Sequence, residues 1–370
     1  MVPTNPTQFI MLGGFLGAGK TTAIARMAQE LTQAGHQVGL VTNDQSHDLV
    51  DTQSLRNQGF SVGEVPGACF CCKFDELVDT LAELENERRP DVIIAEPVGS
   101  CTDLVATVLE PLRKWHDIQY RVGPLGVLLK PEHGTKILRS SSGRGFSPKA
   151  AYIFIKQIEE AQIVAINKVD KLSTEETNEL VDLVRDRFPD KIVIPTSARS
   201  GLGMPELLHE LMQSDSGPFI PIPIDYQVYA EGEAELGWLN ATFQINHTRS
   251  PFTLNRLVLD ILSQFQQALD KCDAEPAHLK ISAHHDTHVA IGNLVDSAAP
   301  AELSRLATEL PVEAALVTVN ARVIIDPKQL EAMVLDVITG LRNNGKECTV
   351  QRMDHFRPAP PTPTHRLVER

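Results

Sequence analysis

The sequence predicts an α/β protein in which a P-loop, doubly wound, mostly parallel sheet is followed by a smaller α+β domain. Two observations carry this prediction. Short apolar, β-rich runs alternate with amphipathic helical patterns as far as residue 212, which is typical of a parallel sheet covered by helices. Beyond the proline-rich stretch at residues 217–223, the order of strands and helices suits an antiparallel sheet with helices on one face.

Apolar periodicity and turn residues place the elements. In the first part we expect strands at residues 9–12, 37–43, 60–62, 91–96, 123–129, 162–167 and 191–195, with helices at 22–28, 75–88, 102–114, 151–160, 175–187 and 204–212. Residues 130–149, rich in Gly, Ser and basic side chains, are expected to form a loop. In the second part we expect strands at 239–246, 279–283, 288–291, 315–319 and 322–325, with helices at 254–269, 301–310 and 327–341.

These elements give a domain plan. We expect a nucleotide-binding domain at residues 1–216, a linker at 217–235, an α+β domain at 236–356 and a disordered tail at 357–370. The length of 370 residues is enough for two hydrophobic cores, and a hydrophobic content of 42% is ordinary for a folded protein.

The composition and the net charge also limit the classes of partner that we expect this protein to bind. A formal net charge of −14 argues against binding nucleic acid through a broad basic surface. We expect no membrane partner, because the sequence contains no apolar run long enough to cross a bilayer and its N-terminus lacks a signal-peptide pattern. Three of the six cysteines fall within four residues, which is unlike a disulfide framework in a chain of this size. A reducing, cytoplasmic setting is therefore expected.

The strongest motif is the glycine-rich stretch Gly13–Thr22, which contains the phosphate-loop pattern G-x4-G-K-[ST] between an expected strand and an expected helix. Glycines let backbone N–H groups turn toward phosphate oxygens, and the N-terminus of the following helix adds its dipole. Lys20 is the expected phosphate-binding and catalytic cation, and the Thr21 hydroxyl is expected to bind Mg²⁺. The nucleotide-binding residues expected here are Gly14, Gly17, Ala18, Gly19, Lys20, Thr21 and Thr22.

A second motif, Asn167-Lys168-Val169-Asp170, follows an expected buried strand. At this place in GTPases, N-K-x-D selects guanine, because the carboxylate accepts from the ring N1–H and the 2-amino group, and adenine lacks that amino donor. Ser197 and Ala198, after the next strand, match the further base-contacting loop of GTPases. The nucleotide is therefore expected to be GTP.

Acidic residues follow two of the expected strands. Glu96 occupies the Walker-B position, where a carboxylate supports Mg²⁺ or the attacking water, and we expect it to be catalytic. The backbone N–H of Gly99 is placed to contact the γ-phosphate. Asp44 and Asp48, after the second strand, are further candidates for Mg²⁺ or switch roles, with an exposed loop as the alternative.

The third motif, Cys69-Phe70-Cys71-Cys72, offers three thiols to one soft or borderline ion such as Zn²⁺, Co²⁺, Ni²⁺ or Cu⁺, of which we favour Zn²⁺ or Co²⁺. Small buried hydrophobic residues or a redox pair are the alternatives. Three thiols leave a tetrahedral site one ligand short, and Cys101, His47 and Glu64 are candidates for that position.

The histidine-rich run at residues 284–288, with His284, His285 and His288, is a weaker signal. Simple strand alternation would not place His285 and His288 on one face, although a turn between them would bring them together. A solvated turn is the favoured interpretation.

With these residues in place, roughly the first 215 residues resemble the CobW-like family of metallochaperone GTPases, relatives of the nickel-insertion GTPases of urease and hydrogenase. The resemblance rests on Gly13–Thr22, the C-x-C-C at Cys69–Cys72 and the motif at Asn167–Asp170. It implies Mg²⁺-dependent GTP hydrolysis, a transition metal at Cys69, Cys71 and Cys72, and a nucleotide state that alters metal affinity and partner docking.

The chain departs from the family pattern in three places. The usual N-E-F-G after the second strand is Asn43-Asp44-Gln45-Ser46, and Gly67-Ala68 stands where N-G usually precedes the cysteines. The usual E-x-x-G-x-A-x-P is replaced by the sequence of residues 96–103, with Cys101 at the alanine position. These differences indicate a divergent branch with its own client.

The sequence therefore predicts a GTPase that binds a transition metal and delivers it to a client metalloprotein, and a homodimer is a further state to consider. Two alternatives stay open. One is a GTP-dependent activator of a cofactor enzyme, such as a corrinoid enzyme, in which the cysteines are structural. The other is a small-molecule kinase that uses the same phosphate loop.

Overall fold

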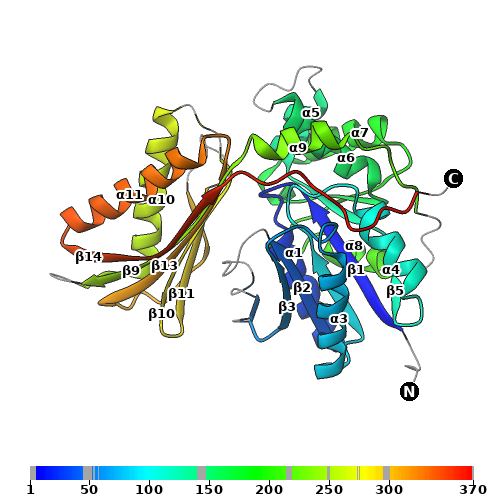
Figure 1. Cartoon of the computed structure of the whole chain (residues 1–370), viewed down its shortest axis with the longest axis horizontal. Helices are drawn as coiled ribbons and strands as arrows, with labels where there is room; N and C mark the ends of the chain where they lie inside the picture. The colour runs from blue at the N-terminus through cyan, green and yellow to red at the C-terminus, as the bar shows by residue number, and fades with distance from the viewer. Residues whose placement is uncertain are drawn as a thin grey trace. The chain divides into compact units, whose positions relative to one another are not determined.

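The computed structural model describes residues 6–44, 52, 55–56, 58–139, 147–213, 219–247, 251–272, 274, 276–294 and 301–368. Contacts between residues divide this chain into two compact units (Figure 1). Unit 1 contains the described residues up to Gly232 together with those from Pro360 onward, and unit 2 contains residues 233–359. The chain thus leaves unit 1 for unit 2 and then returns to unit 1.

Unit 1 is built on a parallel sheet with the strand order β3-β2-β4-β1-β6-β7-β8, to which β5 is added beside β1. Its strands are β1 (Thr7–Gly14), β2 (Val38–Asp44), β3 (Ser61–Pro66), β4 (Val92–Glu96), β5 (Tyr120–Val122), β6 (Gly126–Leu129), β7 (Ile163–Ile166) and β8 (Ile192–Pro195). The order reverses at β1, which is flanked by β4 and β6. In a doubly wound sheet, ligands bind at the carboxyl end of the strand where the order reverses.

Helices cover this sheet. They are α1 (Lys20–Gln33), α3 (Phe74–Arg88), the π-helical turn η1 (Val105–Leu109), α4 (Glu110–Trp115), α5 (Pro131–Arg139), α6 (Pro148–Glu160), the 3-10 turn η2 (Val169–Lys171), α7 (Thr174–Arg187), α8 (Met204–Leu211) and α9 (Tyr226–Ala234). One hydrophobic cluster joins α1 and α8 to inward-facing strand residues such as Ile10 and Leu12. The arrangement confirms the predicted P-loop fold class.

Four parts of unit 1 differ from the sequence-based expectation. In place of one strand at 123–129, the chain forms β5 at 120–122 and β6 at 126–129. The expected loop at 130–149 contains helix α5, whose buried Ile137 anchors it to the core. The expected helix at 102–114 begins with the π-helical turn η1 and continues as α4. The expected linker at 217–235 contains helix α9, and a Cβ at its Gly232 would lie 2.8 Å from the carbonyl oxygen of Lys149, so α9 packs closely on α6.

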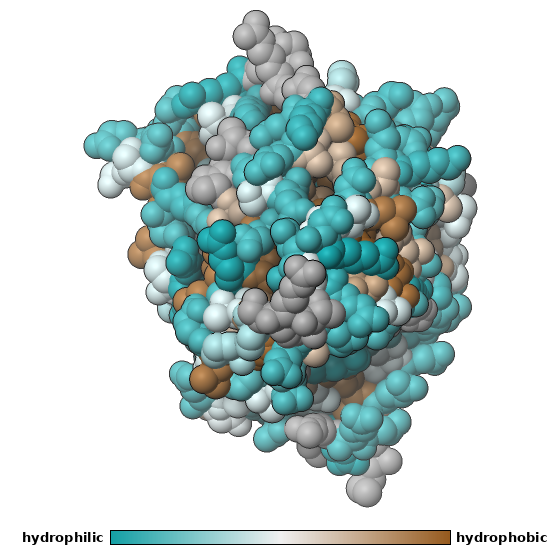
Figure 2. Space-filling view, turned by 90° about the vertical axis from the view of Figure 1, so that its left-hand side faces the viewer, coloured by the Kyte–Doolittle hydropathy of each residue, from teal (hydrophilic) through white to brown (hydrophobic). Residues whose placement is uncertain are grey.

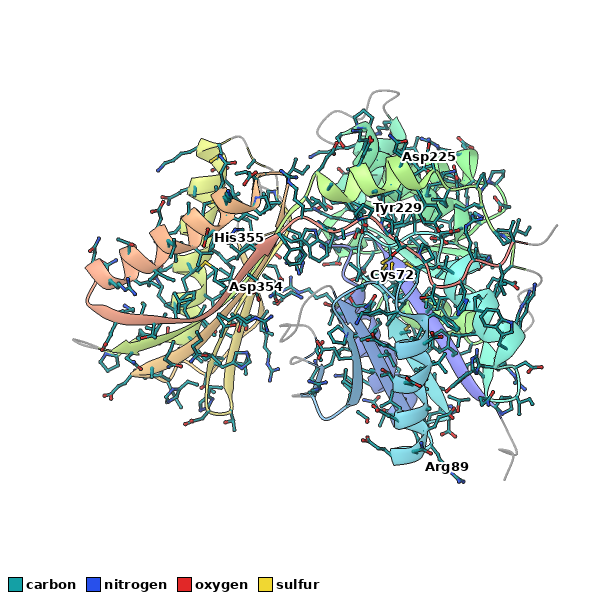
Figure 3. All side chains as sticks on the ribbon, in the orientation of Figure 1. Cys72, Arg89, Asp225, Tyr229, Asp354 and His355 are labelled. Atoms are coloured by element: carbon teal, nitrogen blue, oxygen red, sulfur yellow. The ribbon has the colours of Figure 1, made fainter. Side chains whose placement is uncertain are left out.

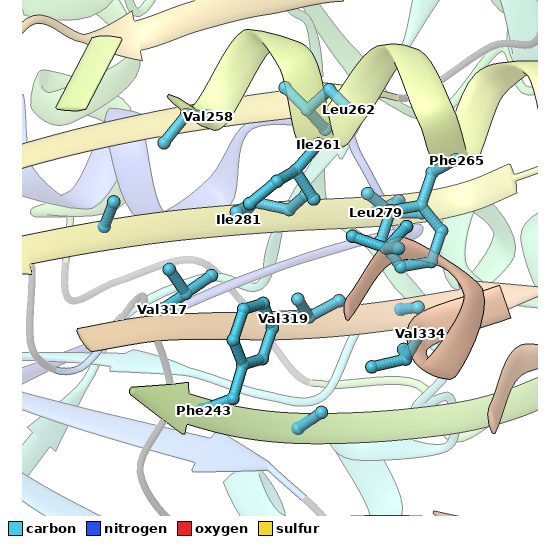
Figure 4. Packing of buried hydrophobic residues seen from close by; sticks show 14 of the residues in the cluster. Phe243, Val258, Ile261, Leu262, Phe265, Leu279, Ile281, Val317, Val319 and Val334 are labelled. Carbon is cyan, nitrogen blue, oxygen red and sulfur yellow. The ribbon is translucent and has the colours of Figure 1, made fainter. Parts of the chain in front are cut away.

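Unit 2 is an antiparallel sheet with the order β12-β11-β10-β13-β9-β14. Its elements are β9 (Gly237–His247), α10 (Leu254–Lys271), β10 (Pro276–His285), β11 (His288–Leu294), β12 (Glu302–Arg305), β13 (Ala314–Val323), α11 (Pro327–Asn343) and β14 (Lys346–Phe356). Both helices lie on the same face of the sheet (Figure 1). Figure 4 shows Ile261 and Phe265 of α10 beside Ile281 and Leu279 of β10. This confirms the predicted α+β class for the second part of the chain.

Three elements of unit 2 differ from the sequence-based expectation. The strands expected at 315–319 and 322–325 are one strand, β13. The pattern at 301–310 predicted a helix, but residues 302–305 form the edge strand β12, which pairs with β11 and leaves Leu306 and Leu310 exposed. Pairing with an open sheet edge outweighs the helix propensity of this segment. Strand β14 was not expected, because its side chains are largely polar and half-exposed.

The histidine run occupies a tight turn. His285 ends β10, His288 begins β11, and the two residues are direct cross-strand partners. Burial and nearby Arg305 lower the pKa of His284, so its imidazole is neutral at pH 7. Among the described residues, these histidines are not part of any metal-binding cluster.

In the described part of the chain, no helix combines the length and apolar character needed to cross a bilayer. On the face drawn in Figure 2, hydrophilic residues predominate and hydrophobic ones occur in small groups.

A buried carboxyl group joins α6 to the segment after β4. Glu160 is 2% exposed and accepts hydrogen bonds from the Thr102 hydroxyl (3.0 Å) and the Val105 N–H (3.2 Å). Burial raises the pKa of Glu160 to about 8, and the neighbouring Asp103 carboxylate acts in the same direction. Because the pKa is higher in the folded state than in the unfolded state, the folded state favours the protonated form.

We expect this carboxyl group to make stability pH-dependent. Its stabilising contribution is complete below the unfolded pKa of 4.5 and is lost as the pH rises through about 8. Thermal unfolding measured between pH 5 and pH 9 should therefore show that the free energy of unfolding of the wild type decreases relative to that of Glu160→Gln as the pH rises. The decrease should be about 1.4 kcal/mol for each unit of pKa shift. Parallel profiles for the two proteins would contradict this assignment.

Candidate nucleotide and metal site

The phosphate loop between β1 and α1 needs glycine at three positions. Gly14, Gly17 and Gly19 have φ of +133°, +74° and +95°, values that residues with a side chain rarely adopt. A Cβ at Gly14 would lie 2.5 Å from the carbonyl oxygen of Leu128, and one at Gly19 would lie 2.5 Å from Nδ2 of Asn167. The loop therefore lies directly against the ends of β6 and β7.

Helix α1 begins at Lys20 without a side-chain N-cap, so its first N–H groups face the loop. Lys20 is only 8% exposed, and its Nζ donates to the carbonyl oxygen of Gly14 (3.0 Å). The Thr21 hydroxyl donates to Oε1 of Glu96 at the end of β4 (3.1 Å), whereas Thr22 is exposed. The structure thus brings together the groups that we expect to act on phosphate and Mg²⁺.

The Asn167 side chain joins this loop to the next two. Its Nδ2 donates to the carbonyl oxygen of Ala18 (2.8 Å), and its Oδ1 accepts from the N–H of Ala198 (2.9 Å). Lys168, with φ of +65°, donates from Nζ to the carbonyl oxygen of Gly17 (2.8 Å). The phosphate loop and both expected base-contacting loops therefore form one hydrogen-bonded assembly.

Asp170 is held in a fixed orientation within that assembly. Its Oδ1 accepts from the Ser197 hydroxyl (2.6 Å), whose oxygen in turn accepts from the N–H of Ser200 (3.1 Å). Arg26 of α1 donates to the carbonyl oxygens of Ala198 (2.7 Å) and Arg199 (2.8 Å) and so fixes the loop after β8. A second carboxylate oxygen of Asp170 is left for another donor.

Gly99 lies against the phosphate loop. A Cβ at this position would approach Cδ2 of Leu16 to 2.7 Å and the Leu16 nitrogen to 3.1 Å. The buried Gln157 of α6 donates from Nε2 to the carbonyl oxygens of both Gly99 (3.0 Å) and Cys101 (2.8 Å). This bridge makes residues 99–101 a short, braced segment beside the nucleotide site.

The three cysteines of the C-x-C-C motif form one cluster, which is the group of possible metal ligands found among the described residues. The Sγ atoms of Cys69 and Cys71 are 2.8 Å apart, those of Cys69 and Cys72 are 3.2 Å apart, and those of Cys71 and Cys72 are 3.8 Å apart. Cys69 and Cys71 are buried and Cys72 is half-buried. We call these three residues the thiol cluster.

Hydrogen bonds within the thiol cluster favour the thiolate form of Cys69 and the thiol forms of Cys71 and Cys72. Hydrogen bonds from Cys101, Cys71 and Cys72 hold the pKa of Cys69 well below its usual value. The hydrogen bond with Cys69 raises the pKa of Cys71 and also raises that of Cys72, to about 11. A bound divalent cation would have to displace the protons of Cys71 and Cys72.

Asn43, near the end of β2, fixes the loop that carries the thiol cluster. Its Nδ2 donates to the carbonyl oxygens of Val65 and Ala68 (2.7 Å each), and its Oδ1 accepts from the N–H of Phe70 (2.8 Å). Of the candidate fourth ligands, Glu64 lies 3.6 Å from Nη2 of Arg56, and among the described residues neither Glu64 nor Cys101 belongs to the group of possible ligands that the three cysteines form. His47 and Asp48 lie outside the described residues, and Asp44 is the last residue of β2.

The described end of the chain covers the thiol cluster, whereas the sequence predicted disorder for residues 357–370. The Thr364 N–H donates to the carbonyl oxygen of Cys71 (2.8 Å), its hydroxyl donates to that of Cys72 (3.0 Å), and the Thr362 N–H donates to Sγ of Cys72 (3.2 Å). Figure 3 shows Cys72 beside this tail. Backbone hydrogen bonds and an ion pair offset the conformational entropy that this proline-rich segment loses when it is ordered.

That ion pair is a second feature that the sequence analysis missed. Asp103 is 1% exposed with φ of +65°, and its carboxylate accepts from Arg366 of the tail (2.6 Å) and from the hydroxyl of Tyr226 on α9. The guanidinium and carboxylate lie 263 residues apart in sequence. Local sequence patterns carry no signal for such a contact.

One known protein family matches the sequence of this part of the chain. The CobW/HypB/UreG nucleotide-binding domain matches residues 8–195, just over half of the 370-residue chain. The chain belongs to this family.

Within the CobW/HypB/UreG family, the chain is similar to proteins described as zinc chaperones. It is 30% identical to the zinc chaperone YjiA of Escherichia coli strain K12 over 102 residues, which cover 27% of this chain and 31% of YjiA. It is 34% identical to the zinc chaperone CobW of a Sinorhizobium species over 128 residues, covering 32% of this chain and 34% of that protein. These matches span about a third of the length of each relative.

Among solved structures, the chain is similar to Zn(II)-bound YjiA GTPase from E. coli. That similarity covers 90% of this chain and 99% of YjiA, with 15% sequence identity and a TM-score of 0.40.

The tail contact leads to a prediction about Cys72. Replacing Arg366 with Ala leaves the buried Asp103 carboxylate without its guanidinium partner, which should destabilise tail attachment by about 1.5–3 kcal/mol. In metal-free, reduced protein, we expect alkylation of Cys72 by iodoacetamide to become several-fold faster, measured by peptide mass spectrometry. Cys272, which is exposed in unit 2, is the internal control. An unchanged rate at Cys72 would show that the tail does not limit access to it.

Proposed function

We propose that this protein is a GTP-binding and GTP-hydrolysing metallochaperone, which holds a transition metal of the Zn²⁺ or Co²⁺ class at Cys69, Cys71 and Cys72 and delivers it to a client protein. The observation that carries the proposal is the thiol cluster, whose sulfurs lie within 3.8 Å of one another in a chain that also has a complete phosphate loop. The names of the relatives, as zinc chaperones, support the same class of cargo.

Guanine recognition is assigned to Asp170. Its carboxylate is oriented by Ser197, and a carboxylate with a remaining acceptor site suits the N1–H and 2-amino donors of guanine. Asn167 and Lys168 would frame the base while keeping their hydrogen bonds to the phosphate loop. Adenine offers no amino donor at the corresponding position, so ATP would leave the carboxylate without its second donor.

Phosphate chemistry is assigned to Lys20, Thr21 and Glu96. Lys20 would transfer its hydrogen bonding from Gly14 to the β- and γ-phosphates, and Thr21 would supply its hydroxyl to Mg²⁺. Glu96, beside Thr21, would hold the metal's water shell or orient the attacking water. The Gly99 N–H, beside Leu16 of the phosphate loop, would sense the γ-phosphate.

Coupling between nucleotide and cargo would run through two short connections. Asn43, near the end of β2, fixes the loop that carries the thiol cluster. Gln157 holds residues 99–101 beside the phosphate loop. Movement of either segment on GTP binding or hydrolysis would alter the thiol cluster and thereby its metal affinity and its docking to a client.

The base assignment is tested by Asp170→Asn. Loss of hydrogen bonds to a charged acceptor should weaken GTP binding by about 10–150-fold, because each is worth about 1.5–3 kcal/mol. The amide, which donates as well as accepts, should improve binding of xanthosine triphosphate, whose ring carries an oxygen in place of the 2-amino group. Calorimetric titration measures both. Equal GTP affinity in the two proteins would exclude Asp170 as the reader of guanine.

The cargo assignment is tested by anaerobic metal binding. Wild-type protein should bind one Zn²⁺ per chain in competition with a chromophoric chelator, and Cys71→Ser should weaken binding by about 100-fold, since one of about four ligands is lost. Cys272→Ser is the matched control and should bind as wild type does. Affinities measured with GDP and with a non-hydrolysable GTP analogue should differ.

Other outcomes favour the other functions. Equal zinc affinity in wild type and Cys71→Ser would favour structural cysteines in an activator of a cofactor enzyme. Phosphate release from GTP and Mg²⁺ without any acceptor, lost in Lys20→Ala, is expected for a GTPase. Turnover that requires an added acceptor molecule would favour a kinase.

A further inference from the structure

The end of the chain lies on unit 1 and reaches the cysteine motif. Residues 360–368 belong to unit 1 and form no helix or strand (Figure 1). The N–H of Thr362 donates to Sγ of Cys72 (3.2 Å), and the N–H of Thr364 donates to the carbonyl oxygen of Cys71 (2.8 Å). The Thr364 hydroxyl adds a hydrogen bond to the carbonyl oxygen of Cys72 (3.0 Å). The motif therefore accepts hydrogen bonds from both the backbone and a side chain of this segment.

An arginine holds the same segment further along. Arg366 donates from Nε and Nη2 to the two carboxylate oxygens of Asp103 (2.6 and 3.3 Å), and its Nη2 also donates to the carbonyl oxygen of Ile222 (3.0 Å). The N–H of Leu367 donates to the carbonyl oxygen of Ala106 (2.8 Å). Because Asp103 is 1% exposed, the guanidinium makes a forked contact with a buried charge.

Between these two anchors, an imidazole packs on an aromatic surface. The ring of His365 lies edge-on to Trp115, with ring centroids 4.8 Å apart, and to Phe74, with centroids 5.5 Å apart. Trp115 keeps 48% of its surface exposed. We call the surface that receives residues 362–367 the tail site, and it is formed by Cys71, Cys72, Phe74, Asp103, Ala106 and Trp115.

The tail site includes the accessible side of the thiol cluster. Cys69 and Cys71 are 5% and 1% exposed, whereas Cys72 is half-buried. A protein that takes up a metal ion by exchange of ligands would therefore reach the thiol cluster at Cys72. The N–H of Thr362 already contacts that sulfur. The end of the chain and an incoming acceptor would compete for the same place.

We propose that the tail site is the surface on which the client protein docks, through a peptide segment that carries an arginine and takes the place of residues 362–367. The inference rests on the proposed delivery of a metal to a client, and it goes beyond that function in naming the docking surface and the chemistry of the segment bound there. In the free protein, the end of the chain fills the tail site.

The groups that a departing tail leaves behind define what the incoming segment brings. The carbonyl oxygens of Cys71, Cys72 and Ala106 need new donors, and backbone N–H groups of any sequence can supply them. The carboxylate of Asp103 loses its guanidinium, and a buried charge without a partner is costly. A guanidinium offers two parallel N–H donors to a carboxylate, so an arginine replaces Arg366 better than a lysine does.

The test uses full-length, reduced, metal-free protein and a fluorescently labelled synthetic peptide with the sequence of residues 360–368. A chain with Thr364→Pro and Arg366→Ala, the released-tail variant, lacks the N–H, the hydroxyl and the guanidinium that hold its own tail. We expect this variant to bind the peptide one to one in fluorescence anisotropy. Wild type should bind it at least about ten-fold more weakly, because the tethered tail competes at an effective concentration of about 1 mM.

Two matched controls test the role of the arginine. A peptide with Arg366→Ala should bind the released-tail variant about 10–150-fold more weakly than the unchanged peptide, because it lacks the hydrogen bonds to a charged acceptor. Protein with Arg357→Ala, which loses an arginine that contacts Asp326 in unit 2, should bind the peptide as weakly as wild type does. Absence of binding to the released-tail variant, or equal affinity for the two peptides, would overturn the proposal.

Zinc measurements separate this proposal from the function on which it rests. Zn²⁺ should pass to a chromophoric chelator several-fold faster from the released-tail variant than from wild type, and added unlabelled peptide should slow the transfer again. Equal rates would show that the tail site does not control access to the metal, which contradicts the proposal. Failure of wild type to bind Zn²⁺ would overturn the proposed cargo, while peptide binding to metal-free protein would still decide whether the tail site is a docking surface.

Discussion

The hydrogen bonds of the Asn167 side chain hold the candidate nucleotide site together. One amide group binds the phosphate loop through Ala18 and the loop after β8 through Ala198, and it occupies the space that a Cβ at Gly19 would need. Asn167 itself follows β7, so its side chain joins the loops that follow β1, β7 and β8, and the hydrogen bonds from Lys168 to Gly17 and from Ser197 to Asp170 reinforce this connection. A buried side-chain amide that makes hydrogen bonds through both its N–H group and its oxygen leaves the bonded loops little freedom to move.

Hydrogen bonds also determine the arrangement of the thiol cluster. Its three sulfurs lie 2.8–3.8 Å apart, and the hydrogen bonds among them lower the pKa of Cys69 while they raise that of Cys71. The thiol cluster is carried by a motif loop that Asn43 of β2 fixes and that the tail covers. Elements from three distant parts of the chain therefore control a site whose sequence signature is only four residues long.

The sequence predicted the fold class and most strands of unit 1, because buried parallel strands are short apolar runs with turn residues at their ends. It was less successful where pairing partners decide the conformation. Residues 302–305 have helix-compatible composition yet form the edge strand β12, and β14 has few apolar residues to indicate a strand. Within the candidate site, motif spacing predicted roles for Lys20, Thr21, Glu96 and Asp170, whereas Asp103, Gln157 and Arg366 belong to no motif. Their roles arise from contacts between residues far apart in sequence, which periodicity does not encode.

The return of the chain from unit 2 to unit 1 has a consequence for limited proteolysis. Unit 2 is inserted within unit 1 in the sequence. Its first and last strands along the chain, β9 and β14, are adjacent in its sheet. A single cut in residues 219–225 would break one covalent connection and leave the other, through residues 357–360, intact. The C-terminal fragment would remain bound to the N-terminal one through the hydrogen bond of Thr364 and through the ion pair of Arg366 with Asp103. The nicked protein should therefore migrate as two bands under denaturing conditions and as one species in its native state.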